Sequence, residues 1–168
     1  ESVKLYSYYN SPEHNESYIE QTEIDCAPGE DEQRVSCITV ASYDFQDEEV
    51  GLPEIIGFTI KNGYANSRGG GVRCIGASPN LEYLIIKENT AGTTGGGIHS
   101  GYGANPNIKN VLIMGNTANH GGGIDCLYSA SAILKNVTIT NNIANNEGSA
   151  IWLHGNSNLN MTNSIIAN

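Results

Sequence analysis

The stretch Gly95-Gly96-Gly97-Ile98 decides the fold of this chain, because close copies of it recur at an even spacing. The other copies begin at Gly69, at Gly121 and, in the altered form Gly-Ser-Ala-Ile, at Gly148. The steps between the copies are 26, 26 and 27 residues. A fixed period of this size is typical of repeat proteins, in which each unit buries its apolar face against the next unit.

Each repeat contains apolar residues at alternate positions before and after the glycines. The columns before them are Phe58/Leu84/Val111/Val137 and Ile60/Ile86/Ile113/Ile139, and the column after them is Val72/Ile98/Ile124/Ile151. Alternation with β-branched residues predicts strands. The position between the first two columns points outward. Its apolar members, Ile85 and Leu112, form a small patch that could contact another domain or chain.

Two columns of turn residues separate these strands. The column Gly63/Asn89/Asn116/Asn142 contains only residues that tolerate positive φ, so we expect a left-handed turn position there. Stacked Asn side chains can also form a hydrogen-bonded ladder. In the glycine triplets the first column, Gly69/Gly95/Gly121/Gly148, also predicts an unusual φ. The next two positions accept Ser149 and Ala150, which indicates that they need only a small side chain.

These motifs resemble those of right-handed parallel β-helix proteins, the pectate-lyase-like superfold. More narrowly, the chain resembles bacterial polymorphic outer-membrane and surface proteins, whose repeats combine GG(A/L/V/I)-(I/V) with FxxN. The first element is present as Gly96-Gly97-Ile98, and the second as Ile86-Lys87-Glu88-Asn89, with Ile in place of Phe. The resemblance covers residues 57–168. It implies an all-β, right-handed parallel β-helix (a solenoid) with coils of about 26 residues, in line with the right-handed crossovers of parallel strands.

Charge divides the chain into two parts. Residues 1–56 contain 14 acidic and 2 basic residues, whereas residues 57–168 contain 4 acidic and 6 basic residues. We expect 1–56 to form one or two irregular acidic first coils, with strands at 4–9, 22–26 and 36–42, that cap the solenoid. Residues 57–168 are expected to form regular coils that continue beyond the end of the chain. The acidic balance argues against a nucleic-acid partner, and no apolar run is long enough to span a membrane.

Neither the acidic runs nor the cysteines predict a firm cofactor site. The runs at 30–32 and 44–49 offer oxygen ligands for Ca²⁺ but match no EF-hand loop, so solvated loops without a cofactor are the main expectation. Cys74 and Cys126 should lie two coils apart, about 9.5 Å, which is too far for a disulfide. Cys26 and Cys37 could pair with each other. No cysteine spacing supports a zinc site.

The strand after the glycines carries the side chains that chemistry would use. Its outward positions form the row Arg73/His99/Asp125/Trp152, with neighbours about 4.8 Å apart, and three positions further Tyr102 and Tyr128 become stacked neighbours. Aromatic rings cover the apolar faces of sugars, while Arg, His and Asp bind hydroxyl or carboxylate groups. The pattern predicts a glycan-binding face, and an ordinary solvent face is the alternative.

We therefore expect a secreted or cell-surface β-helix module with a structural or adhesin-like, non-enzymatic role, whose partner is a polysaccharide or a surface protein. The alternative is a polysaccharide lyase or glycoside hydrolase domain of the pectate-lyase-like class. Glycoside hydrolases use paired carboxylates. Residues 57–168 contain only four acidic residues, and the repeat alignment places no two of them side by side on one strand face.

Overall fold

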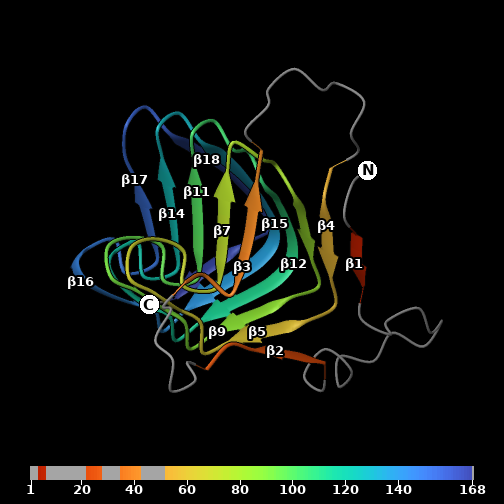
Figure 1. Cartoon of the computed structure of the whole chain (residues 1–168). Coiled ribbons are helices and arrows are strands. Elements are labelled where there is room, and N and C mark those ends of the chain that lie inside the picture. The colour runs from red at the N-terminus through yellow and green to blue at the C-terminus, as the bar shows by residue number, and fades with distance from the viewer. Residues whose placement is uncertain (1–3, 7–21, 28–34, 43–51, 168) are drawn as a thin grey trace.

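The chain forms a solenoid of short parallel strands joined by tight turns (Figure 1). This computed structural model describes residues 4–6, 22–27, 35–42 and 52–167. Within those ranges every regular element is a strand, as the predicted all-β class requires.

Three sheets run along the solenoid. The ten-stranded long sheet contains β1 (Lys4–Tyr6), β2 (Glu23–Asp25), β4 (Glu54–Ile56), β5 (Thr59–Lys61), β8 (Asn80–Glu82), β9 (Ile85–Lys87), β12 (Asn107–Met114), β15 (Ser131–Thr140), β18 (Asn158–Thr162) and β19 (Ile165–Ala167). The five-stranded sheet contains β3 (Ile38–Ala41), β7 (Val72–Ile75), β11 (Ile98–Gly101), β14 (Ile124–Leu127) and β17 (Ile151–Leu153). The four-stranded sheet contains β6 (Tyr64–Ala65), β10 (Thr90–Ala91), β13 (Thr117–His120) and β16 (Ile143–Glu147).

The register of these sheets follows the repeat. Ile98 pairs with Val72 and with Ile124, each 26 residues away, and Ile113 pairs with Ile86 and Ile139, at 27 and 26 residues. The predicted coil length of about 26 residues is therefore confirmed. The apolar columns stack into one buried core along the axis, and each isoleucine buried in it contributes roughly 1.5–3 kcal/mol.

Asparagine side chains form a buried ladder beside this core. The amide oxygen of Asn116 accepts hydrogen bonds from the backbone N–H of Asn89 (3.0 Å) and from its side-chain Nδ2 (2.9 Å). Asn142 does the same for Asn116, at 3.0 and 2.9 Å. Each Nδ2 also donates to the carbonyl of an isoleucine in the preceding coil, for example Asn116 to Ile86 at 2.9 Å. The ladder thus satisfies polar groups in the interior that water does not reach.

The left-handed turn expected at the ladder position is wrong by one residue. Positive φ occurs at the preceding column: Asn62 (58°), Glu88 (57°), Gly115 (64°) and Asn141 (53°). The physical reason is that the two positions have different roles. The preceding residue makes the turn, and the following Asn points its side chain inward to the next coil.

We predict that Asn116→Ala lowers the free energy of unfolding by about 3 kcal/mol, because it leaves buried amides of the neighbouring coils without partners. Asn145→Ala is the matched control, since Asn145 is exposed and makes one side-chain bond to Asn119. This control should cost less than about 0.5 kcal/mol. Urea denaturation followed by circular dichroism measures both, and equal losses would contradict the ladder's role.

The glycine triplets bring the backbones of adjacent coils into contact. The first column has the expected unusual φ, at 68°, 67°, 60° and 68°. The second and third columns are restricted more tightly than the sequence indicated. A Cβ at Gly96 would lie 2.5 Å from the carbonyl oxygens of Thr117 and Gly122, which belong to the next coil. Ser149 and Ala150 escape this restriction because no coil of the described structure packs beyond them.

The strands before residue 57 add to the stack instead of forming a separate unit. β1, β2 and β3 pair in parallel with β4, β5 and β7, and each lies within a segment where the sequence predicted a strand. The division at residue 56 itself stays a prediction. The acidic runs at 30–32 and 44–49, the candidate calcium ligands, lie outside the described residues.

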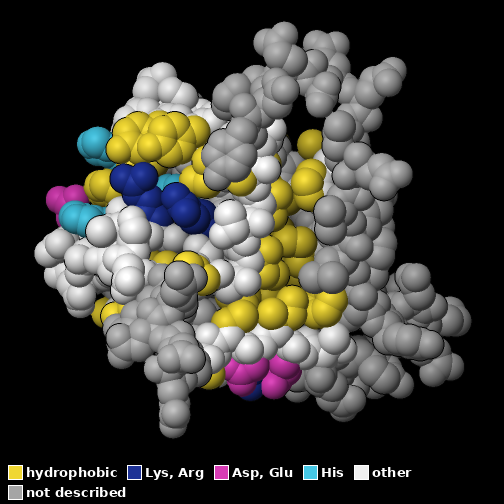
Figure 2. All heavy atoms as spheres, in the orientation of Figure 1, with side chains coloured by type: hydrophobic (Ala, Val, Ile, Leu, Met, Phe, Trp, Pro, Cys, Tyr) yellow, Lys and Arg dark blue, Asp and Glu magenta, His cyan; other side chains and the backbone are white. Residues whose placement is uncertain are grey.

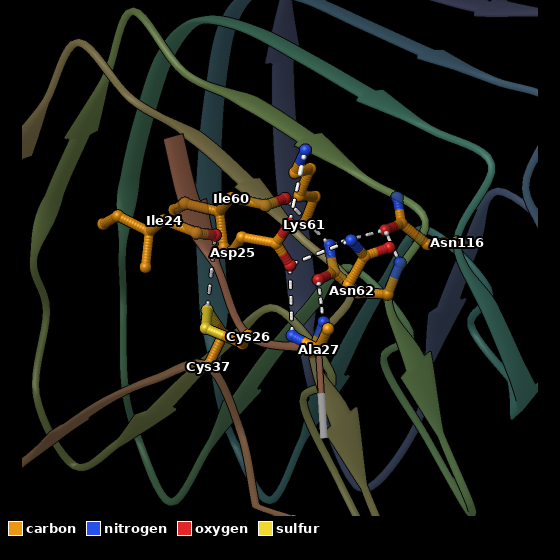
Figure 3. Close-up of a disulfide and its surroundings, with 11 residues drawn as sticks. Ile24, Asp25, Cys26, Ala27, Cys37, Ile60, Lys61, Asn62 and Asn116 are labelled. Carbon is orange, nitrogen blue, oxygen red and sulfur yellow. Dashed lines mark hydrogen bonds and ion pairs between the residues drawn. A yellow bond between two sulfur atoms is a disulfide. The ribbon is translucent and has the colours of Figure 1, made fainter. Parts of the chain in front are cut away.

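A disulfide ties these first strands together (Figure 3). Cys26, after β2, is bonded to Cys37, before β3, with their Cα atoms 5.6 Å apart. The backbone N–H groups of both cysteines donate to the following coil, to the carbonyls of Lys61 and Gly70 at 3.0 Å. Lys61 also pairs with Glu23 at 2.7 Å. The pairing that the sequence left open is therefore present.

The other two cysteines are free and buried. Cys74 and Cys126 both pair in register with Ser100, which lies on the strand between theirs, so they are two coils apart as predicted. Burial raises the pKa of each thiol from the ordinary value of 9.0 to about 12. Both thiols are therefore protonated and shielded in the native protein.

We predict that the two thiols make stability fall as pH rises from about 9 to about 12. In that window the unfolded thiols lose protons and the folded thiols keep them, so proton release favours unfolding. Urea denaturation at pH 8 and pH 10 measures the loss. The Cys74→Ala/Cys126→Ala variant should lose less stability over the same interval, and an equal loss in the variant would refute the assignment.

Candidate functional site

The predicted outward row is present on the five-stranded sheet, where β7, β11, β14 and β17 lie side by side (Figure 1). His99 pairs in register with Arg73 on one side and with Asp125 on the other, and Asp125 pairs with Trp152. The repeat thus brings four different side chains from four coils into one line.

The expectation that this whole row faces solvent is wrong for two of its members. The side chains of His99 and Asp125 are 0% exposed, whereas Arg73 and Trp152 are half-buried. A second row covers the first. It consists of the residue that precedes the first glycine of each coil, namely Arg68, Thr94, His120 and Glu147, which are joined by parallel backbone bridges.

Glycine lets these two rows touch. A Cβ at Gly69 would lie 2.8 Å from Cβ of Arg73, and a Cβ at Gly121 would lie 2.8 Å from Cβ of Asp125. Any larger residue in this column would therefore clash with the sheet beneath the second row. The apolar and glycine columns of the sequence do not predict this second row, although the repeat aligns the position before each triplet.

His99 and Asp125 form a buried pair beneath the second row. Nδ1 of His99 lies 2.9 and 3.0 Å from the two carboxylate oxygens of Asp125. Burial raises the pKa of the Asp125 carboxyl, and the hydrogen bond from His99 acts in the opposite direction. Nε2 of His99 is buried and has no hydrogen-bond partner among the described residues. Because Nε2 is shielded from solvent, the pair lacks the access to substrate that a general base needs.

The two tyrosines lie at the end of the same strands and are open to solvent. Tyr102 is 50% exposed and Tyr128 is 44% exposed, with ring centroids 4.8 Å apart and a tilt of 35°. Both have positive φ, at 56° and 54°. The equivalent residues of the flanking coils are Gly76 and Gly155, which have φ of 61° and 64°. For a bulky residue this conformation costs about 1–2 kcal/mol.

The indole of Trp152 is engaged by the protein itself. It stacks with His120 (centroids 4.6 Å, 28°) and with His154 (5.2 Å, 8°), and its Nε1 donates to Glu147 at 3.2 Å. The tyrosines therefore offer the freer aromatic surface on this face. Figure 2 shows hydrophobic side chains, basic side chains and histidines gathered there.

The geometry also bears on the cofactor and membrane questions. Among the described residues no three His, Cys, Asp or Glu side chains are grouped to hold a metal ion. The described part of the chain likewise has no helix of the length and apolarity needed to cross a membrane.

On the long sheet, Ile85 and Leu112 of the predicted apolar patch line a shallow groove together with Thr59, Lys87 and Met114.

Comparison with known proteins agrees with this architecture. A family described as right handed beta helix region matches residues 47–168, and the chain belongs to it. The right-handed parallel β-helix that the repeats predict is thereby shown. Neither the curated proteins nor the solved structures contain a match to the chain. The narrower resemblance to bacterial polymorphic surface proteins stays a prediction.

We predict that Asp125→Ala destabilises the protein by about 3 kcal/mol, because it leaves His99 buried without a partner. Glu147→Ala, in the covering row, is the control, since that carboxylate is 70% exposed and should contribute less than about 1 kcal/mol. Thermal unfolding compares the two variants. A small loss for Asp125→Ala would show that the buried pair does not support the face.

Proposed function

We propose that this protein is a non-enzymatic, secreted or cell-surface β-helix module with an adhesin-like role, and that it binds glycans through the five-stranded sheet. One observation carries the proposal. Tyr102 and Tyr128 hold strained backbone conformations at a turn where the flanking coils use glycine, and they leave about half of each side chain in solvent.

Such a placement is costly for the fold. A tyrosine that is half exposed recovers only part of its burial energy, so packing is a weak reason to replace glycine at a left-handed turn. Strained, exposed residues concentrate at binding sites, where function compensates for the lost stability. The two phenol rings lie against each other at a tilt, and their half-exposed surface, here called the tyrosine platform, combines apolar carbon with polar hydroxyl groups. Such a surface suits the apolar face and the hydroxyl groups of a sugar.

The disulfide supports the proposed extracellular location. Disulfides form and persist mainly in oxidising compartments, such as the cell exterior or the bacterial periplasm. The Cys26–Cys37 bond closes the first strands against the regular coils. A stiff solenoid that presents one ligand face is a suitable architecture for a surface module.

The burial of Asp125, the carboxylate of the outward row, favours a binding function over hydrolysis. Asp125 is buried against His99, whereas glycoside hydrolysis needs an acid and a second carboxylate that both reach the substrate. A lyase or hydrolase domain of the pectate-lyase-like class is therefore the second candidate.

We predict that Tyr102→Gly and Tyr128→Gly abolish glycan binding while leaving stability unchanged or raising it by up to about 1 kcal/mol, because glycine relieves the backbone strain. Binding is measured on a glycan array and then by calorimetry with the best ligand. Thermal unfolding gives the stability of each variant.

Tyr83→Gly is the matched control, since Tyr83 has the same left-handed backbone (φ 53°) but precedes β9 of the long sheet. It should leave glycan binding unchanged. If the wild-type chain binds no glycan, or if both tyrosine-to-glycine variants bind as well as the wild type, the proposed function is refuted.

A further inference from the structure

We propose that the glycan bound on this face is acidic, and that its carboxylate or sulfate group lies between Arg68 and Arg73. This inference rests on the proposed glycan-binding function and specifies the class of sugar. It starts from where the positive charges of the described residues lie.

Both arginines of the described residues are on the candidate face, although the whole chain has a net charge of −10. Arg68 belongs to the covering row and Arg73 to the outward row. On the long sheet, Lys61 pairs with Glu23 and Lys109 pairs with Glu82. Among the described residues neither arginine forms an ion pair, and both side chains are partly exposed, so an anion would not have to displace a carboxylate.

Arg68 and Arg73 lie close together on the candidate face. Gly69, which follows Arg68, packs so tightly on Arg73 that a Cβ on Gly69 would lie 2.8 Å from Cβ of Arg73. The guanidinium carbon of Arg68 lies 5.5 Å from the centre of the Tyr128 ring. A sugar on the tyrosine platform would therefore place an acidic substituent within reach of a cation. Arginine binds carboxylate and sulfate-like groups through paired hydrogen bonds.

Buried polar atoms next to this point lack partners. Nε of Arg73 and Nε2 of His99 are both buried without a hydrogen-bond partner among the described residues, and the two residues are neighbours in register. Buried polar atoms without hydrogen-bond partners are rare in folded proteins. The buried Nε of Arg73 is as closed to a ligand as Nε2 of His99, so an acid group would bind Arg73 through the terminal nitrogens of its half-exposed side chain.

The tyrosines decide between a sugar acid and a free inorganic anion. Phosphate or sulfate alone would use the arginines and leave both aromatic rings without a function. An acidic sugar uses the rings and the cations together, and it gives a reason for the strained backbone at both tyrosines.

Two ligand pairs test this inference by calorimetry on the intact chain. The first is a uronic acid oligosaccharide and its methyl ester, and the second is a sulfated oligosaccharide and its desulfated form. We expect the wild type to bind at least one acidic member at least tenfold more tightly than its neutral partner. Whichever acid is preferred identifies the source of the negative charge.

Arg68→Gln and Arg73→Gln should each weaken binding of that acid at least tenfold and leave binding of the neutral partner unchanged. Lys135→Gln is the matched control, because it removes the same charge from the exposed surface of the long sheet. It should bind like the wild type. Circular dichroism confirms that each variant is folded, and Arg68→Gln provides the test if Arg73→Gln does not fold.

Equal binding of acidic and neutral partners, or binding of the acid unaffected in the folded arginine variants, overturns this inference and leaves the proposed glycan-binding function standing. Binding of no oligosaccharide at all overturns both. Loss of binding in Lys135→Gln as large as in the arginine variants would show a general charge effect and also overturn the inference.

Discussion

The close approach of neighbouring backbones at the glycine triplets is the constraint on which the rest of the structure depends. At Gly96 the space for even one methyl group is occupied by carbonyl oxygens of the next coil. This contact fixes the distance and register between coils, so that Asn116 can hydrogen-bond to Asn89 on one side and to Asn142 on the other. The ladder and the glycines are also neighbours in space, since a Cβ at Gly97 would lie 3.1 Å from Nδ2 of Asn116. Each coil therefore sets the position of the next one.

The same glycines shape the candidate site. The first glycine of each triplet carries no side chain between the outward row and the covering row, so a layer of polar residues packs directly on the sheet. His99 and Asp125 lie at the bottom of this layer as a buried hydrogen-bonded pair. Above and beside them, Arg68 and the two strained tyrosines remain accessible. The candidate site therefore lies at a turn where backbone strain at the two tyrosines lowers the local stability, on a solenoid held together by the other contacts between its coils.

The repeat period made the fold predictable, because a coil length and an alternating apolar pattern determine which residues stack. The outward row was predicted in register for the same reason. Burial was not predictable from the pattern, since it depends on how the turn before Gly95 folds back over the sheet. The left-handed turn was placed one residue too late because Glu88, which makes it in one coil, is a residue type that rarely adopts positive φ. The strain at the tyrosines could have been inferred from the glycines that replace them in the flanking coils.

The account's central claim is that Tyr102 and Tyr128 are the surface on which a sugar lies. Intermolecular nuclear Overhauser effects between the ring protons of these tyrosines and the sugar-ring protons of a bound oligosaccharide test it most directly. We expect contacts to both tyrosine rings, and none to side chains of the long sheet such as Leu112. Contacts confined to the long sheet, or to Trp152 without either tyrosine, would contradict the account.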